Sequence, residues 1–342
     1  MVFVCPISNE LSDRGRQRAR PRTGLVLGAG GVLGAAWMTG ALACLQDRLP
    51  CALGDVDVIV GTSAGSVLAA ALRCGTSVPE MVAWQRGEVT GALSASAALA
   101  ALDGPLPPLP YLRFGSVPLA RAALLAPHRV PPWVGASALL PHGRGQHVAL
   151  RSLIEALQRR HDEGRAPQAW PDGDTWFAAV DYDTGQSVFF GREGAPLACV
   201  PDAVVASCSI PGWHEPQLIG GRRYVDGGVR SVTSLSVLSG ENLGEVYVLA
   251  PMASIEIDYP LQAYLRIERP LRQMITHSVL RQARVLSAQG MRVTVLTPGH
   301  QDLSAMGINL MDGRRKEAVL EASFVTSADA LARLDRTGAR AA

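Results

Sequence analysis

The stretch Asp57-Val58-Ile59-Val60-Gly61-Thr62-Ser63-Ala64-Gly65-Ser66-Val67 decides the fold of this chain. Its apolar run 58–60 predicts a buried strand, and an almost wholly apolar helix is expected from about residue 64 to residue 74. Between them stands Gly-Thr-Ser-Ala-Gly, a G-x-S-x-G pattern typical of a nucleophile elbow. The two glycines allow a tight, strained turn. Ser63 is therefore expected at the N-terminus of the helix, where free N–H groups favour negative charge.

A second glycine-rich segment precedes this stretch. Residues 23–27 predict the first strand, which runs into Gly28-Ala29-Gly30-Gly31-Val32-Leu33-Gly34 and then an apolar helix to about residue 49. Free N–H groups at such a helix start form an anion site, either a dinucleotide pyrophosphate cradle or an oxyanion hole. A dinucleotide site expects an acidic residue at the end of the next strand. Ser63 follows that strand instead, which disfavours the nucleotide hypothesis.

The composition indicates a globular chain with a large core. Its 342 residues are 48% hydrophobic, with a mean hydropathy of +0.15 and a net charge of +2. Apolar content of this size excludes a disordered chain, and the small net charge gives no reason to expect a nucleic-acid partner. No apolar run of about eighteen residues lacks breakers, so no transmembrane span is predicted.

Residues 1–22 form a basic leader with alternating arginines: Arg14, Arg16, Arg18, Arg20 and Arg22. The apolar stretch 1–7 is short, precedes the charges and has no small-residue cleavage site, so a secretory signal is not predicted. We expect a disordered leader, and a membrane-attracted arm is the alternative hypothesis. The remainder is expected to be one domain over residues 23–335, with a short tail at 336–342.

The cysteines have neither zinc-site spacing nor a C-x-x-C motif. They are Cys5, Cys44, Cys51, Cys74, Cys199 and Cys208. Most stand in apolar contexts typical of buried free thiols. This predicts a reducing cytoplasm as the location, with peripheral contact to a membrane as a further expectation. His142 and His147 have no companion ligands at metal spacing, so no metal is predicted.

Apolar strands alternate with helices along the rest of the chain, which predicts a mostly parallel sheet with helices on both faces. Strands are expected at 175–183, 187–191, 222–225, 245–250 and 291–296, the first two joined as a hairpin. Helices are expected at 76–90, 148–160, 202–207, 270–289 and 312–334, with Pro270 at the start of its helix.

The segment 91–145 interrupts this alternation. Prolines break it at 105–110 and again at 127–133, yet it remains apolar. Such an insertion is consistent with a cap over a greasy substrate cleft or with a membrane-contact surface. A packed subdomain of short helices is the alternative.

Ser63 needs a base, and Asp226 is the strongest candidate. It follows the strand 222–225 and precedes Gly227 and Gly228, which allow a sharp turn and leave room for a carboxylate to approach another loop. A carboxylate in a dry cleft has a raised proton affinity, which suits a general base. An ordinary Asp-Gly-Gly turn is the alternative interpretation.

Taken together, these motifs resemble the patatin-like phospholipase family. The glycine loop, G-T-S-A-G about thirty residues later, a segment at 206–212 like the family's A-S-x-A-x-P, and D-G-G at 226–228 occur in the family's order. The resemblance implies a three-layer α/β/α fold and hydrolysis of lipid acyl esters of the phospholipase A or lysophospholipase type. It implies Ser63 as nucleophile and Asp226 as base, without a histidine or a cofactor. The N–H groups of Gly30, Gly31 and Val32 would form the oxyanion hole.

The chain departs from the family pattern at two places. The loop usually reads G-G-G-x-[K/R]-G, whereas here Ala29 replaces the first glycine and Leu33 replaces the basic residue. After D-G-G, where many members carry asparagines, this chain has residues 230–234, Arg-Ser-Val-Thr-Ser. The first departure removes a cation that could contact a head group, and the second is expected to be structural.

Two rival functions remain open. An α/β-hydrolase-like esterase would use a Ser-Asp-His triad, for which His300, expected on a loop after the strand 291–296, and His214 are candidates. A catalytically dead lipid-binding or regulatory protein is the second rival, and Leu33 is the feature that favours it. The sequence does not specify which lipid is the substrate.

Overall fold

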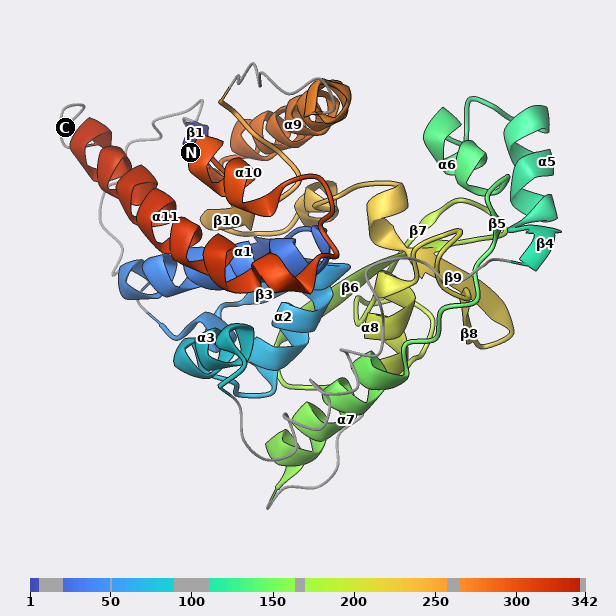
Figure 1. Ribbon diagram of the computed structural model, residues 1–342, viewed down its shortest axis with the longest axis horizontal. Helices are drawn as coiled ribbons and strands as arrows, with labels where there is room; N and C mark the ends of the chain where they lie inside the picture. Colours follow the sequence, from blue (N-terminus) through green and yellow to red (C-terminus); the bar gives the residue numbers. More distant parts are fainter. Residues whose placement is uncertain (6–20, 50, 89–110, 164–169, 257–264, 339–342) are drawn as a thin grey trace.

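The computed structural model describes residues 1–5, 21–49, 51–88, 111–163, 170–256 and 265–338 (Figure 1). A nine-stranded sheet runs through its centre in the order β1-β11-β10-β2-β3-β6-β9-β8, with β7 paired to β6. The strands are β1 Val2–Cys5, β2 Thr23–Leu27, β3 Val58–Thr62, β6 Asp174–Asp181, β7 Ser187–Phe190, β8 Gln217–Ile219, β9 Arg222–Asp226, β10 Glu245–Leu249 and β11 Arg292–Leu296.

The centre of the sheet is parallel. Strands β11, β10, β2, β3 and β6 pair with their neighbours in the parallel sense, whereas β1, β7, β8 and β9 are antiparallel additions. Every residue of β2 and of β3 is buried, as expected where helices cover both faces. The predicted hairpin of β6 and β7 is confirmed.

Helices cover both faces of this sheet, which confirms the predicted three-layer α/β/α fold (Figure 1). On one face lie α1 Gly31–Leu45, α2 Ala64–Arg73, α3 Val78–Arg86, α7 Val148–Asp162, α8 Val200–Cys208, α10 His300–Met306 and α11 Lys316–Gly338. On the other face α9, Leu265–Ala288, packs with the short η4 segment, Leu235–Leu238. Successive side chains of β2 point to opposite faces of the sheet, so Leu25 and Leu27 enter the core on the first face and Val26 enters the core on the second.

Residues 111–145 form a small subdomain, here called the cap. It contains β4 Tyr111–Phe114, α5 Val117–Leu125, α6 Pro132–Ser137 and β5 Pro141–His142. Its own core, with Leu119 and Val134, packs on Val180 and Val225 of the sheet. The described part of the predicted 91–145 insertion is therefore a packed subdomain, which stands at one end of the molecule in Figure 1. Residues 91–110 lie outside the described residues.

The leader prediction is wrong at its first residues. Residues 2–5 form strand β1, which pairs antiparallel with β11. The apolar sequence Val-Phe-Val-Cys supplies the hydrogen bonds that this side of β11 would otherwise leave unmade. Residues 6–20, with most of the arginines, lie outside the described residues. Arg22, at the end of the leader, is 3.5 Å from Asp174 and 3.9 Å from Asp57.

Two helix boundaries also differ from expectation. Pro270 lies inside α9, which begins at Leu265; as the sixth residue of the helix it lacks the N–H for one i→i−4 hydrogen bond, yet the helix continues through it. His300 is the first residue of α10 and not part of a loop, because Asp302 accepts the N–H of Gly299 at 2.8 Å and so caps a new helix. No helix of the described residues is both long enough and apolar enough to cross a membrane.

Candidate active site

Ser63 occupies a strained turn between β3 and α2. Its backbone has φ 53° and ψ −121° at the N-cap of α2, a region that side-chain-bearing residues rarely adopt. A Cβ atom at Gly61 would lie 2.5 Å from the Cα of Ser66, and one at Gly65 would lie 2.0 Å from the carbonyl oxygen of Leu27. The turn is so tight that only glycine fits at these two positions.

Asp226 is the last residue of β9, and its carboxylate is buried. It accepts a hydrogen bond from the backbone N–H of Gly228 at 2.7 Å, and the Ser63 hydroxyl is close enough to favour its ionised form. Burial raises the pKa of Asp226 from 3.8 to about 6, and the nearby Ser63 hydroxyl and Gly228 N–H partly oppose the rise. Gly227 is required here because a Cβ would lie 2.5 Å from the carbonyl oxygen of Ala178.

Strand β6 brings the two residues together. It pairs with β3 through Ala178 opposite Thr62, and with β9 through Ala179 opposite Asp226. Consecutive residues of β6 therefore hold the end of β3 and the end of β9 next to each other. The juxtaposition of Ser63 and Asp226, which are 163 positions apart in the sequence, is a consequence of this shared neighbour.

The glycine loop leads into α1, and its outer amides are fixed by the neighbouring segments. The N–H of Gly28 donates to Leu249 O at 2.9 Å, and the N–H of Ala29 donates to Val232 O at 2.7 Å. A Cβ on Gly228 would lie 3.2 Å from the Cβ of Ala29, so the loop lies against the Asp226 turn.

The middle amides of the loop are different. Within the described part of the chain no acceptor is recorded for the N–H groups of Gly30, Gly31 and Val32, whereas Leu33 donates to Leu310 O at 2.9 Å. These three groups lie at the start of α1, a fifteen-residue helix whose dipole adds positive potential at this end. The loop can accordingly bind an oxyanion beside Asp226.

Packing explains the glycines and the departure at Leu33. A Cβ on Gly30 would lie 2.6 Å from the ring of Pro251, and Gly34 contacts the same ring. Gly31 has φ +61° and lies against Met311, where a Cβ would be 2.9 Å from the sulfur. Leu33 is fully buried in the core beneath α1. Its side chain therefore fills part of the hydrophobic core, which a basic side chain would not do in this chain.

Residues at the end of α8 contact the turn that contains Ser63. The buried hydroxyl of Ser207 accepts the backbone N–H of Ser63 at 2.9 Å. Ser66 donates its hydroxyl to Ser63 O at 2.6 Å and contacts the sulfur of Cys208 at 3.6 Å. Burial raises the pKa of the Cys208 thiol, so it stays protonated at neutral pH. Ser207 was not among the predicted site residues, although the segment 206–212 that contains it resembles a motif of the family.

The two histidine candidates make their recorded contacts with other residues. His300 is exposed at the start of α10, and its Nδ1 is 3.3 Å from the hydroxyl of Ser304. His214 is buried and stacks on His147 at 3.9 Å between ring centroids, and its Nδ1 accepts the N–H of Ile210. Burial lowers the pKa of His147 to about 4 and that of His214 to about 3, so both are neutral. None of these recorded contacts involves Ser63 or Asp226.

The fold and the site define a class before any relative is considered. They place a buried serine on a strand–turn–helix junction, a buried carboxylate next to it and a helix start with free N–H groups, an arrangement typical of serine hydrolases. The family model for patatin-like phospholipases matches residues 25–238, more than half of the chain. The chain therefore belongs to the patatin-like phospholipase family.

Comparisons with individual proteins give distant matches. VipD of Legionella pneumophila is 12% identical over 90% of this chain and 66% of its own, with a TM-score of 0.43. Human GIVD cytosolic phospholipase A2, solved with methyl γ-linolenyl fluorophosphonate and terbium chloride, is 14% identical over 95% of this chain and 60% of its own, with a TM-score of 0.35. ExoU of Pseudomonas aeruginosa, in complex with SpcU, is 18% identical over 94% and 61%, with a TM-score of 0.31. The chain spans less than two thirds of the length of VipD, GIVD phospholipase A2 and ExoU. No curated protein sequence matches it.

Proposed function

We propose that the protein releases fatty acids from lipid esters, as a phospholipase A or lysophospholipase, through a dyad of Ser63 and Asp226. The observation that carries this is the position of the buried Asp226 carboxylate next to Ser63, since consecutive residues of β6 pair with the ends of β3 and β9. With its pKa raised to about 6, this carboxylate is ionised at neutral pH yet binds a proton more readily than an exposed aspartate.

The first half of the reaction acylates Ser63. Asp226 takes the hydroxyl proton as Oγ attacks the ester carbonyl carbon, and the carbonyl oxygen becomes an oxyanion. The N–H groups of Gly30, Gly31 and Val32 bind this oxyanion, each contributing about 3 kcal/mol as in hydrolases with comparable donors. The tetrahedral intermediate then collapses, and the leaving alcohol takes the proton back from Asp226.

The second half frees the fatty acid. Asp226 takes a proton from a water molecule, whose oxygen attacks the acyl carbon bound to Ser63. The same three amides bind the second oxyanion, and the proton returns to Oγ as the acid leaves. No cofactor or metal takes part in this scheme, since fixed amides hold the charge.

The substrate comes from a lipid phase in this proposal, and the protein works in the cytoplasm at a membrane surface. The described cysteines support a reducing compartment, because they are free thiols: Cys44, Cys51, Cys74, Cys199 and Cys208.

A lipid panel tests the proposal. Phospholipid, lysophospholipid, acylglycerol and a short soluble ester are each incubated with the wild type and with Ser63→Ala, and released acid is measured. We expect release from at least one lipid by the wild type and none by Ser63→Ala, whose thermal unfolding should match the wild type.

Labelling by a fluorophosphonate probe distinguishes an active enzyme from a catalytically dead lipid-binding protein. A live Ser63 reacts and carries the label, whereas the Ser63→Ala variant does not. Turnover retained in Ser63→Ala would refute the dyad, and a wild type that neither reacts nor hydrolyses would favour a lipid-binding role.

A further inference from the structure

Helix α5 of the cap presents apolar side chains to solvent. Val117, Leu124 and Leu125 are 65%, 83% and 73% exposed, whereas Leu119 on the opposite side is fully buried against the sheet. At 3.6 residues per turn, positions 117, 121, 124 and 125 fall on one side of the helix. A surface helix normally turns its apolar stripe to the core, so this second stripe is unaccounted for by the fold.

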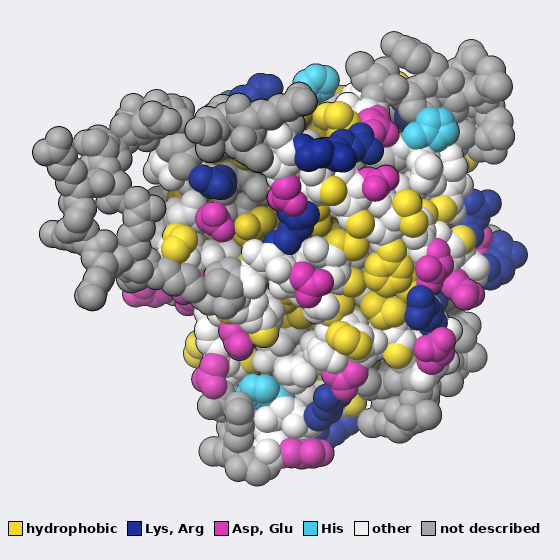
Figure 2. Space-filling view, turned by 90° about the vertical axis from the view of Figure 1, so that its left-hand side faces the viewer, with side chains coloured by type: hydrophobic (Ala, Val, Ile, Leu, Met, Phe, Trp, Pro, Cys, Tyr) yellow, Lys and Arg dark blue, Asp and Glu magenta, His cyan; other side chains and the backbone are white. Residues whose placement is uncertain are grey.

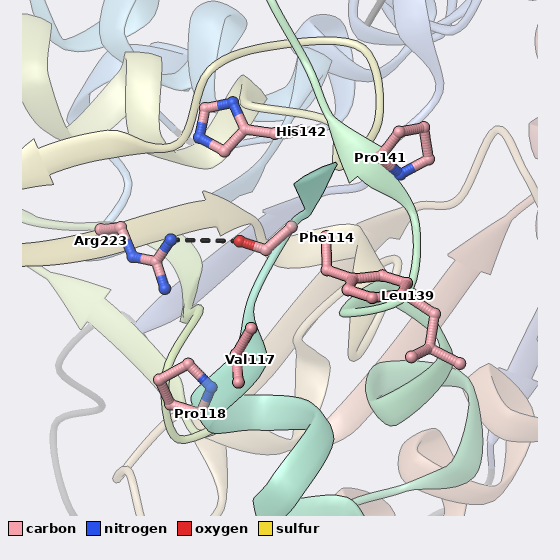
Figure 3. Close-up of a pocket in the computed structure, with 8 residues that line it drawn as sticks. Phe114, Val117, Pro118, Leu139, Pro141, His142 and Arg223 are labelled. Atoms are coloured by element: carbon pink, nitrogen blue, oxygen red, sulfur yellow. Dashed lines mark hydrogen bonds between the residues drawn. The ribbon is translucent and has the colours of Figure 1, made fainter. Parts of the chain in front are cut away.

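The stripe continues into an apolar pocket of about 660 Å³ (Figure 3). Val117 and Pro118 of α5 line it together with Phe114 and Leu139, and the last two are 64% and 60% exposed. The pocket therefore opens on the solvent side of the cap, and a hydrogen bond of 3.1 Å from Arg223 to Gly115 O ties it to the sheet. We name the stripe and pocket rim the apolar cap surface: Phe114, Val117, Leu124, Leu125 and Leu139.

The charged side chains that the cap itself contributes have one sign. Residues 104–154 contain no aspartate or glutamate, and Arg121 within the stripe and Arg129 just after it are both exposed. Asp183, an acid beneath the cap, is bonded to Arg223 and Ser116. By contrast, the opposite end of the molecule mixes acidic and basic side chains among hydrophobic ones (Figure 2). The cap surface is thus both apolar and positive.

We propose that the apolar cap surface docks on an anionic lipid bilayer. Leu124 and Leu125 would enter the boundary between head groups and acyl chains, and Arg121 would pair with lipid phosphates. The inference rests on the proposed function, because a lipid hydrolase must draw its substrate from a lipid phase. A second copy of the chain is a poorer occupant, since pairing two caps would bring like-charged Arg121 and Arg129 together.

Vesicle binding tests the proposal without interference from hydrolysis. The Ser63→Ala variant of the whole 342-residue chain is sedimented with vesicles of phosphatidylcholine alone and of phosphatidylcholine with 50% phosphatidylglycerol. We expect binding to the anionic vesicles, weakened at least about tenfold by Leu124→Ser/Leu125→Ser and about fivefold by Arg121→Glu. The matched control is Leu271→Ser/Met274→Ser, two side chains on α9 that are 55% and 62% exposed, which should bind as before.

The outcomes separate this inference from the proposed function. In the background with Ser63 intact, Leu124→Ser/Leu125→Ser should hydrolyse a short soluble ester at the wild-type rate, which also shows that it folds. Binding unaffected by Leu124→Ser/Leu125→Ser and Arg121→Glu would overturn the docking surface even if hydrolysis holds. A wild-type dimer that Leu124→Ser/Leu125→Ser converts to monomer, without any vesicle binding, would show that a second copy is the occupant instead. Vesicle binding by a protein with no esterase activity would keep the surface and refute the enzyme.

Discussion

The backbone N–H of Ser63 donates a 2.9 Å hydrogen bond to the hydroxyl oxygen of Ser207, a fully buried residue on α8. At the start of α2 this N–H has no helical acceptor. Since Ser63 is held at a positive φ, the bond helps to keep this residue in an otherwise unfavourable conformation. Helix α8 therefore positions the elbow as well as packing beneath it.

Ser207→Ala should lower kcat/KM about ten- to a hundredfold, because the attacking oxygen is no longer fixed in place. The free energy of unfolding should fall by about 1–2 kcal/mol, since a buried N–H loses its acceptor. The rate of fluorophosphonate labelling and thermal unfolding measure the two effects.

Ser209→Ala is the matched control for Ser207→Ala. Ser209 is also buried at the end of α8, but its hydroxyl donates to Val205 O at 2.8 Å and not to the elbow. A slower labelling rate in both variants alike would assign the effect to loss of packing in α8, not to positioning of Ser63.

Asp226→Asn should reduce kcat by about a thousandfold or more, because an amide cannot accept the serine proton. In the wild type the carboxylate must be ionised to act, so kcat/KM should rise with pH through an apparent pKa of about 6 and level off above it. A pH–rate profile on a soluble ester measures this. A flat profile from pH 5 to pH 8 would count against Asp226 as the base.

The same residue predicts a pH-dependent stability difference. The folded-state pKa is raised from 3.8 to about 6, so the native state penalises the ionised form. The penalty is absent below about pH 4 and fully present above about pH 6. At roughly 1.4 kcal/mol per unit, it is at most about 3 kcal/mol. Asp226→Asn should thus unfold at a higher temperature than the wild type at pH 8, and the difference should vanish towards pH 4.

Gly65→Ala should prevent folding. The added methyl group would lie 2.0 Å from the carbonyl oxygen of Leu27, and neither β2 nor α2 can move without opening the core. Gly75→Ala is the control, because Gly75 has φ +78° but no atom within 4 Å of the added Cβ; it should cost only about 1–2 kcal/mol. Circular dichroism and thermal unfolding distinguish the two, and a folded, stable Gly65→Ala protein would contradict the packing argument.

His300→Ala should leave kcat/KM within about twofold of the wild type, since the exposed ring of His300 has its recorded contact with Ser304 on its own helix. A soluble ester assay is sufficient. A loss of a hundredfold or more, with unfolding unchanged, would favour a Ser-Asp-His triad over the dyad.

Much of the fold could be predicted because it depends on local pattern. The apolar strands β2, β3, β10 and β11 and the glycine turns after β2, β3 and β9 follow from residue types whose conformational preferences act over a few positions. The motifs Gly-Thr-Ser-Ala-Gly and Asp-Gly-Gly, in their order, also indicated Ser63 and Asp226 as partners through the family resemblance. The boundaries at Pro270 and His300 were misjudged, because helix ends depend on capping contacts that composition does not reveal.

Other features required the tertiary structure. Residues 2–5 look like part of a charged leader until β11 is seen to offer them an edge. Ser207 acquires its role only when α8 is packed behind the elbow. In the sequence, Leu33 is only a departure from the family's basic residue; the structure shows that its side chain is buried in the core.

By itself, then, the sequence determined which residues can make a strand, a strained turn or a helix start, because steric and hydrogen-bonding preferences are properties of short segments. It did not determine which of these segments meet. The pairing of β3 and β9 with consecutive residues of β6 decides that Ser63 lies beside Asp226. The packing of one side of α5 on the sheet likewise decides that the leucines on its other side face solvent. Both depend on contacts between residues far apart in the chain, whose geometry only the packed molecule fixes.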